Sequence, residues 1–306
     1  MKFVLIVNPK AGASNKAGML RSVVATLPEK DDCEVYETKA PGDATVFVND
    51  WCEKHPGEAV RFVACGGDGT LNEVIAGAVG KENVSVTCYP CGSGNDFVKV
   101  FGGANTFASI TELLRAPAQP LDLLKAGDRY AHNVINFGFD TTVAITINKE
   151  REKTGHGNKN AYTKGVVTAL VKSMNNTCTV TADGEVLNPD GKALLCTLAN
   201  GQYVGGSFRC APRAKTDDGL MEVCMIRPIS RLRFVKILTP YTNGEHLDRP
   251  EMQDIVIYRQ AKKVEVDAPA GFAYSLDGEI VYENHFTVEL IPAAIQFAVP
   301  QRAEKE

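Results

Sequence analysis

The sequence predicts an α/β domain followed by a mainly β domain, and three observations support this prediction. In residues 1–120 of the 306-residue chain, short apolar runs alternate with stretches of helical spacing, as in a parallel sheet with connecting helices. Polar segments rich in glycine follow three of these runs. After the proline-rich stretch 117–120, runs typical of strands outnumber helical patterns, as in a β-sandwich.

The most informative segment reads as a strand, a tight glycine turn and a helix. The apolar run 60–65 predicts a buried strand, Gly66 and Gly67 interrupt it, and helical spacing begins at Leu71. The glycines let the backbone approach a ligand closely, and free N–H groups at the helix start favour an anion such as phosphate. Asp68 beside such a site favours a divalent cation. A plain βα connection with Asp68 as a helix cap is the alternative.

Two further segments have the same design. The run 2–7 ends at Asn8 and is followed by the polar loop 10–16 and a helical pattern. The run 84–89 is followed by the loop 90–97, in which glycines flank a serine. Neither loop has the Walker form of a P-loop. Because ligands of parallel α/β sheets lie beyond the carboxyl ends of the strands, we expect the three loops to converge on one crevice.

The rest of the first half contains one more strand and three helices by the same criteria. We expect a strand at 33–38 and a helix at 43–54, whose Trp51 is assigned to the core. Two further helices are expected at 97–100 and 107–114.

Strands dominate the second half. They are predicted at 134–139, 178–182, 193–199, 221–226, 254–258, 263–267, 272–276 and 287–291. One helical stretch at 162–173 interrupts them, and the polar segment 150–160 is expected to be a mobile loop. A last apolar run lies at 295–299.

Charge and composition narrow the function classes. The formal net charge of −4 gives no argument for nucleic acid as a partner. The nine cysteines stand singly and the five histidines show no ligand spacing, so neither disulfides nor a zinc site are expected. No run has the length of a transmembrane segment, and the apolar run 3–7 is too short for a secretion signal. We therefore expect a cytoplasmic protein.

Several motifs, taken together and in order, carry a family resemblance. They are Asn8-Pro9 with its glycine loop, GGDGTLNE at 66–73, GSGNDF at 92–97, Asn200-Gly201 through Gly205-Gly206, PRAKTDDGL at 212–220 and LDGE at 276–279. The chain resembles, over nearly its whole length, the diacylglycerol kinase catalytic family, specifically the soluble bacterial lipid kinases of the DgkB and YegS type. GGDGT alone is shared with NAD kinases and 6-phosphofructokinases, whereas the ordered set is specific.

The resemblance implies two domains. A Rossmann-like nucleotide domain, of the kind found in phosphofructokinases and NAD kinases, would comprise residues 1–122 and 293–306. A β-sandwich domain for the lipid substrate would comprise residues 123–292. The residues implied at the ATP site are Asn8, Gly66, Gly67, Asp68, Gly69, Thr70, Ser93, Asn95 and Asp96.

The resemblance also implies metal sites. Asp68, Asp96 and Asp122 are the candidates for the catalytic Mg²⁺ and its waters. A structural metal would be held by the Asp218 carboxylate and the main-chain oxygens of Lys215 and Leu220. A β-turn with no metal fits the composition of this segment equally well.

Glu279 matches the family's proposed general base, which would take the proton of the acceptor hydroxyl. From the residues alone, an exposed glutamate in a hairpin is the alternative. Asp277 ranks second as a functional carboxylate, and its alternative is to cap its own turn.

Fewer sequence features bear on how the chain would contact a membrane and bind a lipid. Lysines and arginines are frequent between residues 149 and 236, which suits an anionic membrane surface, although solvated charges are the alternative. Apolar residues assigned to an acyl-chain pocket, with plain core as the alternative, are Val134, Phe137, Phe139, Val143, Val166, Val167 and Leu170.

We therefore expect an ATP- and Mg²⁺-dependent lipid kinase that phosphorylates a hydroxyl of diacylglycerol or a related lipid alcohol. It would be cytoplasmic and associate peripherally with a membrane during catalysis, with no nucleic-acid partner; a homodimer is left open. Two alternatives remain: an NAD kinase, which shares GGDGT, and a nucleotide-binding regulator without catalysis.

Overall fold

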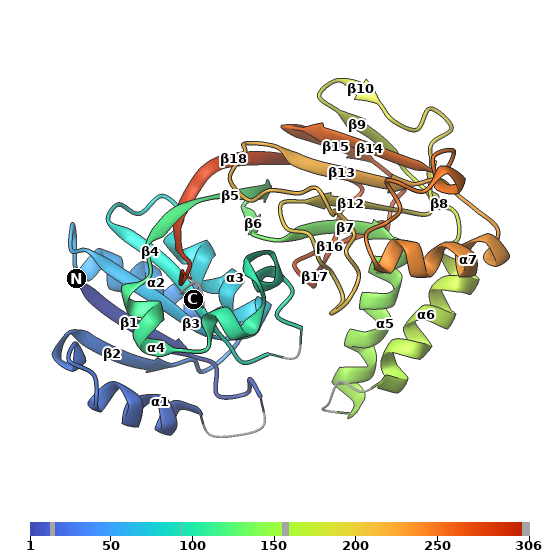
Figure 1. The fold of residues 1–306 in the computed structure, drawn as a ribbon. Helices are drawn as coiled ribbons and strands as arrows, with labels where there is room; N and C mark the ends of the chain where they lie inside the picture. The colour runs from blue at the N-terminus through green and yellow to red at the C-terminus, as the bar shows by residue number, and fades with distance from the viewer. Residues whose placement is uncertain (13–15, 93, 155–158, 302–306) are drawn as a thin grey trace, which may run out of the picture. The chain divides into compact units, whose positions relative to one another are not determined.

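The computed structural model describes residues 1–12, 16–92, 94–154 and 159–301, with only the backbone of 151–154 and 159–162 (Figure 1). The chain divides into two compact units. Unit 1 comprises Met1–Leu123 and Pro292–Glu306, and unit 2 comprises Leu124–Ile291.

Unit 1 is a parallel sheet with connecting helices. Its elements are β1 (Lys2–Val7), α1 (Lys16–Ala25), η1 (Lys30–Asp32), β2 (Cys33–Glu37), α2 (Asp43–Lys54), β3 (Val60–Gly66), α3 (Asp68–Ala78), β4 (Val84–Pro90), η2 (Phe97–Phe101), η3 (Ala104–Phe107) and α4 (Ile110–Arg115). The strand order is β2-β1-β3-β4, and all three pairs are parallel. The end of β18 (His285–Ala298) adds a parallel strand beside β4.

The core of unit 1 follows from the apolar strands. Every residue of β3 is buried, as expected for a strand covered on both faces, and this includes Arg61, which donates to the Leu113 carbonyl at 2.8 Å. α3 packs on β3 and β4, and its residues Val74 and Ile75 are buried. A β-carbon on Gly77 would lie 2.8 Å from the Thr45 carbonyl oxygen, so glycine lets α3 pack closely on α2.

Among the described residues, unit 2 contains three α-helices, strands of two larger antiparallel sheets and one two-stranded antiparallel sheet. Its elements are β6 (Arg129–Ala131), β7 (Val134–Gly138), α5 (Phe139–Thr154), α6 (Lys159–Lys172), β8 (Asn176–Thr177), β9 (Thr179–Ala182), β10 (Glu185–Val186), β11 (Lys192–Ala193), β12 (Leu195–Ala199), β13 (Met221–Ile226), α7 (Arg231–Thr242), η4 (Pro250–Met252), β14 (Val256–Ala261), β15 (Lys263–Asp267), β16 (Ala273–Leu276) and β17 (Glu279–Tyr282). One sheet has the order β14-β13-β12-β7-β16-β17. In the other, β9 pairs with β10 and β15, and β15 pairs with β18. β5 (Ala118–Ala126) enters from unit 1 and pairs with β6.

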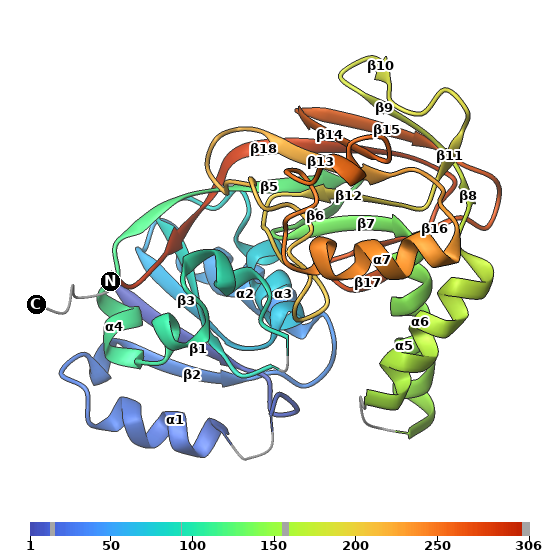
Figure 2. The same cartoon turned by 45° about the vertical axis from the view of Figure 1, so that its right-hand side comes forward.

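Alternate residues of β7 point into two different cores. Ile135 and Phe137 join Val264 and Val266 of the other sheet, so the two sheets form a sandwich. Val134 joins a second cluster, in which Phe139, Val143, Phe234 and Ile237 come from α5 and α7. The predicted fold class, an α/β domain followed by a β-sandwich, is therefore confirmed. Figure 2 shows α5 and α6 side by side.

The structure differs from the predicted elements at several places in the chain. α5 was not predicted: residues 150–154 and 159–160 are helical instead of a loop, and 155–158 lie outside the described residues. α7 was also missed; the Ser230 side chain caps it by accepting from the Arg233 amide. The runs 287–291 and 295–299 form one strand, β18. Residues 97–100 belong to a 3₁₀ helix, and the helix expected at 107–114 is α4. None of the described helices has the length and apolar character needed to cross a bilayer.

Candidate active site

The three glycine-rich loops of unit 1 are in contact. They follow β1, β3 and β4, which run parallel and therefore end at the same edge of the sheet. The Asn8 amide donates to the Cys65 carbonyl at 3.0 Å, and the Cys91 amide donates to the Gly66 carbonyl at 2.7 Å. The Asn8 Nδ2 donates to the Thr70 Oγ1 at 3.1 Å. The convergence expected from strand order is thus present within unit 1.

Glycine is required where two of these loops touch. A β-carbon on Gly92 would lie 2.6 Å from the Gly67 Cα, closer than any real side chain tolerates. A β-carbon on Gly66 would lie 2.2 Å from the Thr70 Oγ1. Gly69 has nothing within 4 Å of a β-carbon and is exposed at the start of α3. Gly92 and Gly66 are thus constrained by packing, whereas Gly69 is open to solvent or to a ligand.

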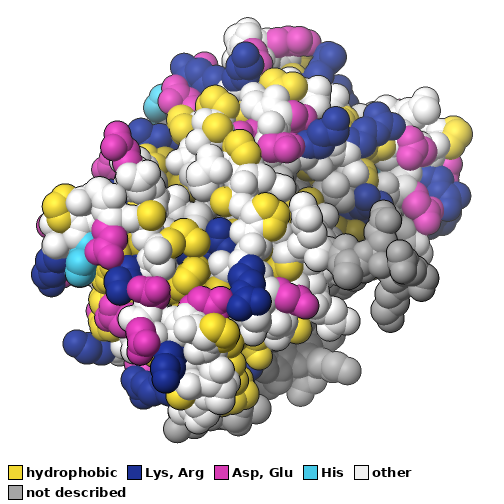
Figure 3. Space-filling model, turned by 60° about the vertical axis from the view of Figure 1, so that its left-hand side comes forward, with side chains coloured by type: hydrophobic (Ala, Val, Ile, Leu, Met, Phe, Trp, Pro, Cys, Tyr) yellow, Lys and Arg dark blue, Asp and Glu magenta, His cyan; other side chains and the backbone are white. Residues whose placement is uncertain are grey.

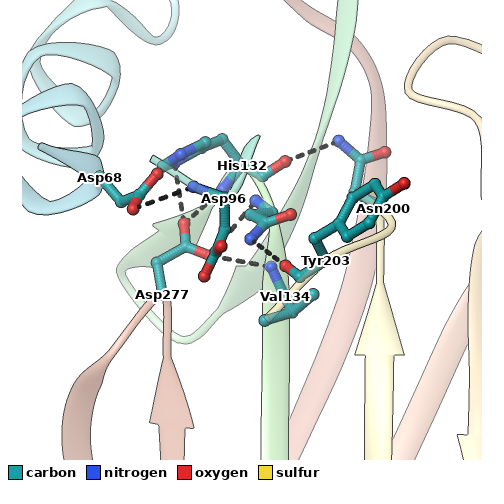
Figure 4. A network of polar contacts seen from close by, with 8 residues as sticks. Asp68, Asp96, His132, Val134, Asn200, Tyr203 and Asp277 are labelled. Carbon is teal, nitrogen blue, oxygen red and sulfur yellow. Dashed lines mark hydrogen bonds and ion pairs between the residues drawn. The ribbon is translucent and has the colours of Figure 1, made fainter. Parts of the chain in front are cut away.

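Asp68 lies where the loop after β4 meets the start of α3. It is the first residue of α3, and its Oδ2 accepts from the Asp96 amide at 3.2 Å (Figure 4). A β-carbon on Gly94 would lie 3.2 Å from the same oxygen. The Asp96 carboxylate forms an ion pair with Lys99. A carboxylate at a helix start, next to glycine backbone, is an arrangement that Mg²⁺ and phosphate together can use.

Two lysines near the loops were not predicted as site residues. The Lys16 Nζ lies 3.1 Å from where a β-carbon of Gly12 would stand, and it acts to lower the pKa of the neighbouring Cys91 thiol, which burial raises overall. Lys99 pairs with Asp96. Both cations would attract a polyphosphate. Nothing in the neighbouring sequence distinguishes Lys16 or Lys99 from an ordinary surface lysine. Only the fold shows that both lie near the glycine loops.

The remaining predicted residues of unit 1 have mainly structural contacts. The Asn95 side chain accepts from the Gly92 amide at 3.2 Å and donates to the Gly92 carbonyl at 2.7 Å, which closes its own loop. The Asp122 Oδ1 accepts from the Ala293 amide at 2.7 Å, and Asp122 is 2% exposed. Ser93 lies outside the described residues.

In unit 2, Glu279 is the first residue of β17 and follows a two-residue hairpin turn. Leu276 pairs with Glu279 across the turn, and Asp277 and Gly278 both have positive φ, at 46° and 96°. These angles are typical of a type I′ turn, which matches the twist of the flanking strands. The Glu279 side chain belongs to an exposed residue.

The Asp277 carboxylate anchors this hairpin to the segment before β7. Oδ2 accepts from the His132 amide at 2.8 Å and Oδ1 from the Val134 amide at 2.8 Å (Figure 4). The His132 Nδ1 lies 2.8 Å from Oδ2, with both side chains at most 2% exposed. Burial raises the pKa of the Asp277 carboxyl, but His132 and the hydrogen bonds outweigh burial and lower that pKa below 3.8.

The Asn200-Gly201 motif holds the same segment. The Asn200 Nδ2 donates to the His132 carbonyl at 3.0 Å, and the Gly201 amide donates to the Asn133 carbonyl at 2.9 Å. A β-carbon on Gly201 would lie 2.0 Å from the Asn133 Oδ1. Two motifs that lie far apart in the sequence therefore position one backbone segment, and His132 was not singled out from the sequence.

The sequence Asp-Gly-Glu occurs a second time, and the structure shows the same hairpin there. Asp183 and Gly184 have φ of 45° and 86° between the paired residues Ala182 and Glu185. The Asp183 carboxylate accepts from the Lys263 amide at 2.9 Å. Unlike Asp277, Asp183 is exposed. The local motif alone therefore does not single out Glu279.

The turn expected to hold a structural metal is hydrogen-bonded. The Asp218 Oδ1 accepts from the Leu220 amide at 3.1 Å, and Gly219 has a φ of 74°. Within the described ranges no three His, Cys, Asp or Glu side chains are placed to hold a metal. A cation here would depend on main-chain oxygens, such as that of Lys215, in addition to one carboxylate.

One cysteine–histidine pair is unsuited to nucleophilic catalysis. The Cys224 Sγ lies 3.6 Å from the His246 Nε2, and both residues are buried. Burial raises the pKa of the Cys224 thiol far above its ordinary value and lowers the pKa of His246 to about 4. The thiol and the imidazole are therefore both neutral near pH 7, and no thiolate forms.

Comparisons with known proteins identify two family domains in the chain. Residues 2–126 match the diacylglycerol kinase catalytic domain, and residues 133–299 match the YegS C-terminal NAD kinase beta sandwich-like domain. The chain is 31% identical to the "Probable lipid kinase YegS-like" of Serratia proteamaculans (strain 568), over 98% of this chain and 95% of that one. It is 26% identical to the "Diacylglycerol kinase" of Bacillus subtilis (strain 168), over 90% and 88% of the two chains. A crystal structure of a diacylglycerol kinase from Bacillus anthracis str. Sterne has a TM-score of 0.74 at 23% identity, covering 97% of this chain and 96% of that one, and shares the fold.

Proposed function

This chain belongs to the diacylglycerol kinase family with the YegS-like lipid kinases, and on that premise we propose that it transfers the γ-phosphate of ATP to a hydroxyl of diacylglycerol or a related lipid alcohol. The observation that carries the proposal is the contact of three glycine loops around Asp68 at the start of α3. Polyphosphate binding needs close backbone approach, a helix start and nearby cations, and unit 1 supplies all three.

We assign the nucleotide to the loop region of unit 1. The candidates to contact it are Asn8, Gly66, Gly67, Asp68, Gly69, Thr70, Asn95 and Asp96, together with Lys16 and Lys99. Asp68 fits a Mg²⁺ ligand, because its carboxylate lies among backbone groups that phosphate oxygens could approach. Bound Mg²⁺ would neutralise phosphate charge during transfer. Asp96 and Asp122 are the other candidates; one Asp96 oxygen pairs with Lys99, and one oxygen of the buried Asp122 accepts from the Ala293 amide.

We assign the acceptor proton to Glu279. A carboxylate that accepts the proton of an attacking hydroxyl contributes on the order of 100-fold to 10,000-fold. The hairpin that carries Glu279 is held by Asp277, so the position of the base is defined relative to β7. We propose direct in-line transfer with no covalent phosphoenzyme. The neutral, buried Cys224–His246 pair supports this, because it offers no nucleophile.

The test is a substrate panel. Purified full-length chain is incubated with γ-labelled ATP and Mg²⁺ and with diacylglycerol, phosphatidylglycerol, a sphingoid base or NAD, and products are separated by thin-layer chromatography. We expect label on a lipid and none on NAD. Label on NAD alone would establish the NAD kinase alternative. Tight ATP binding with no turnover on any acceptor would favour a nucleotide-binding regulator.

A further inference from the structure

Two neighbouring helices of unit 2 expose apolar side chains to solvent. On α6, Val167 and Val171 are 55% and 66% exposed, and their spacing of four places them on one face. On α7, Leu232 and Val235 are 80% and 63% exposed and lie three residues apart. We call these four residues the α6–α7 apolar patch. Val167, which the sequence assigned to an acyl-chain pocket with plain core as the alternative, is therefore not a core residue.

The two helices are joined next to the patch. The Arg231 Nε donates to the Leu170 carbonyl at 2.7 Å. Each partner of this bond is a sequence neighbour of a patch residue, Leu232 on one side and Val171 on the other. Figures 1 and 2 show α7 beside the end of α6. The exposed side chains therefore belong to one local surface.

The charged residues of α6 and α7 themselves are all basic. α6 contains three lysines and α7 two arginines and a lysine, and neither helix contains an Asp or Glu. The whole chain, by contrast, has 33 basic and 37 acidic residues. On the face drawn in Figure 3, basic and acidic side chains are interspersed.

Part of this positive charge is neutralised by neighbouring elements. Lys164 pairs with Glu150 of α5 at 2.6 Å, and Arg233 pairs with Asp254 at 2.5 Å. Lys172, Arg231 and Lys236 are exposed and form no ion pair with another described residue. These three cations flank the apolar patch.

We propose that the α6–α7 apolar patch, with Lys172, Arg231 and Lys236, is the surface by which the chain docks on an anionic lipid bilayer. Apolar side chains that insert at the acyl boundary, surrounded by cations that contact anionic headgroups, bind membranes by two additive terms. The positive charge is what selects an anionic bilayer as the partner. The proposal deepens the proposed function, on which it rests, because a kinase of membrane lipids must reach its acceptor.

Vesicle flotation tests the apolar part. The probes are vesicles of phosphatidylcholine alone and of phosphatidylcholine with phosphatidylglycerol at about a 7:3 ratio. We expect wild type to float with the anionic vesicles and V171E/L232E to bind them at least roughly tenfold more weakly. The matched control is Val46→Glu, at a 58% exposed valine of α2 in unit 1, which should bind like wild type. Unchanged binding by V171E/L232E, or no binding by wild type, overturns the proposal.

Charge reversal tests the electrostatic part. K172E/K236E should weaken binding to the anionic vesicles by roughly 25-fold or more, at about fivefold for each lysine lost. The control K30E/K54E makes the same change at exposed lysines of unit 1 and should have little effect. Equal losses in both double variants would mean that net charge alone drives binding, and would overturn the assignment of the surface.

Two readouts separate this proposal from the proposed function. Activity on a short-chain, water-soluble diacylglycerol should be equal in wild type and V171E/L232E, while activity on vesicles falls with binding. Patch-dependent vesicle binding with no kinase activity on any lipid would leave the docking surface intact and refute the proposed function. If size-exclusion chromatography shows that V171E/L232E converts a dimer to a monomer without affecting flotation, the patch is a contact between copies and the proposal is wrong.

Discussion

Asp277 and His132 are joined twice through one oxygen atom. The Asp277 Oδ2 accepts a hydrogen bond from the His132 amide at 2.8 Å, and the His132 Nδ1 lies 2.8 Å from the same oxygen. Both side chains are at most 2% exposed, so water does not replace these contacts. These contacts hold the turn that precedes β17, and therefore Glu279, next to the start of β7.

Asp277→Asn should reduce both stability and turnover. One amide NH₂ would replace a carboxylate oxygen that accepts backbone hydrogen bonds, at a cost of about 1–3 kcal/mol in the free energy of unfolding. If Asp277 positions Glu279, kcat should fall at least about tenfold while the KM for ATP stays constant. The measurements are denaturant unfolding and steady-state kinetics.

Asp183→Asn is the matched control for that experiment. It makes the same change in the second Asp-Gly-Glu hairpin, where the carboxylate is exposed and holds the Lys263 amide. This variant should keep wild-type kcat. Equal loss of kcat in both variants would contradict a positioning role for Asp277.

Glu279→Gln should abolish turnover without weakening ATP binding. Glutamine cannot take the acceptor proton, so kcat should fall by roughly 100-fold to 10,000-fold. Calorimetry should show near-normal affinity for ATP, because we assign the nucleotide to unit 1. Glu185→Gln is the control, since Glu185 occupies the same position of the other hairpin and pairs with Arg259. Unchanged phosphorylation by Glu279→Gln would refute the base assignment.

Gly92→Ala should destabilise the protein, whereas Gly69→Ala should not. The new methyl group at 92 would clash with the Gly67 Cα, and relieving this clash should cost about 1–3 kcal/mol and weaken ATP binding. At 69 the methyl group enters open space in the first turn of α3, so stability should be unchanged or up to about 1 kcal/mol higher. Thermal unfolding with and without ATP measures both. Equal destabilisation would contradict the close contact of the two loops.

Asp140→Asn should stabilise the protein at neutral pH. Burial raises the pKa of Asp140 to about 6, and the Asp140 Oδ2 has no hydrogen-bond partner among the described residues. The Asp140 carboxyl binds its proton more tightly in the folded state than in the unfolded state. The free energy of unfolding of the wild type therefore falls as the pH rises from about 4 to 6. The variant should gain up to about 3 kcal/mol at pH 8 and nothing below about pH 4.

Denaturant unfolding at pH 4, 6 and 8 checks this dependence on pH. Asp190→Asn, at an exposed aspartate, is the control and should show no such trend. A gain for Asp140→Asn that is the same at all three pH values would contradict the assignment of the effect to ionisation.

Chelation should test the structural metal proposed at Asp218. If a cation binds there at about 100 times its Kd, it contributes about 2.7 kcal/mol, and EDTA should lower the Tm of wild type by several degrees. Asp218→Ala should lower the Tm similarly and remove the response to EDTA, while kcat stays nearly constant. Asp217→Ala, one residue away, is the control. A Tm that responds to neither EDTA nor Asp218→Ala would leave only the hydrogen bond to the Leu220 amide at this turn.

The two-domain fold and the meeting of the glycine loops were predictable because their signals are local. Apolar runs such as 60–65, glycines at their ends and helical spacing after them define each strand–loop–helix unit. Parallel pairing then brings the loops to one edge. α5 and α7 were missed because their apolar positions are diluted by polar ones, and their helical state depends on packing against the sheet.

The sequence by itself determined which residues can turn tightly, approach a phosphate or carry a proton, since these are properties of single residues and short segments. Only the tertiary structure decided between chemically identical motifs. Asp277 and Asp183 are both followed by Gly-Glu, yet the Asp277 side chain is buried against His132 and Asp183 is exposed. The reason is physical: hydrogen-bond partners 144 or 145 residues away are brought together by burial of the sheets, and no local pattern records that distance.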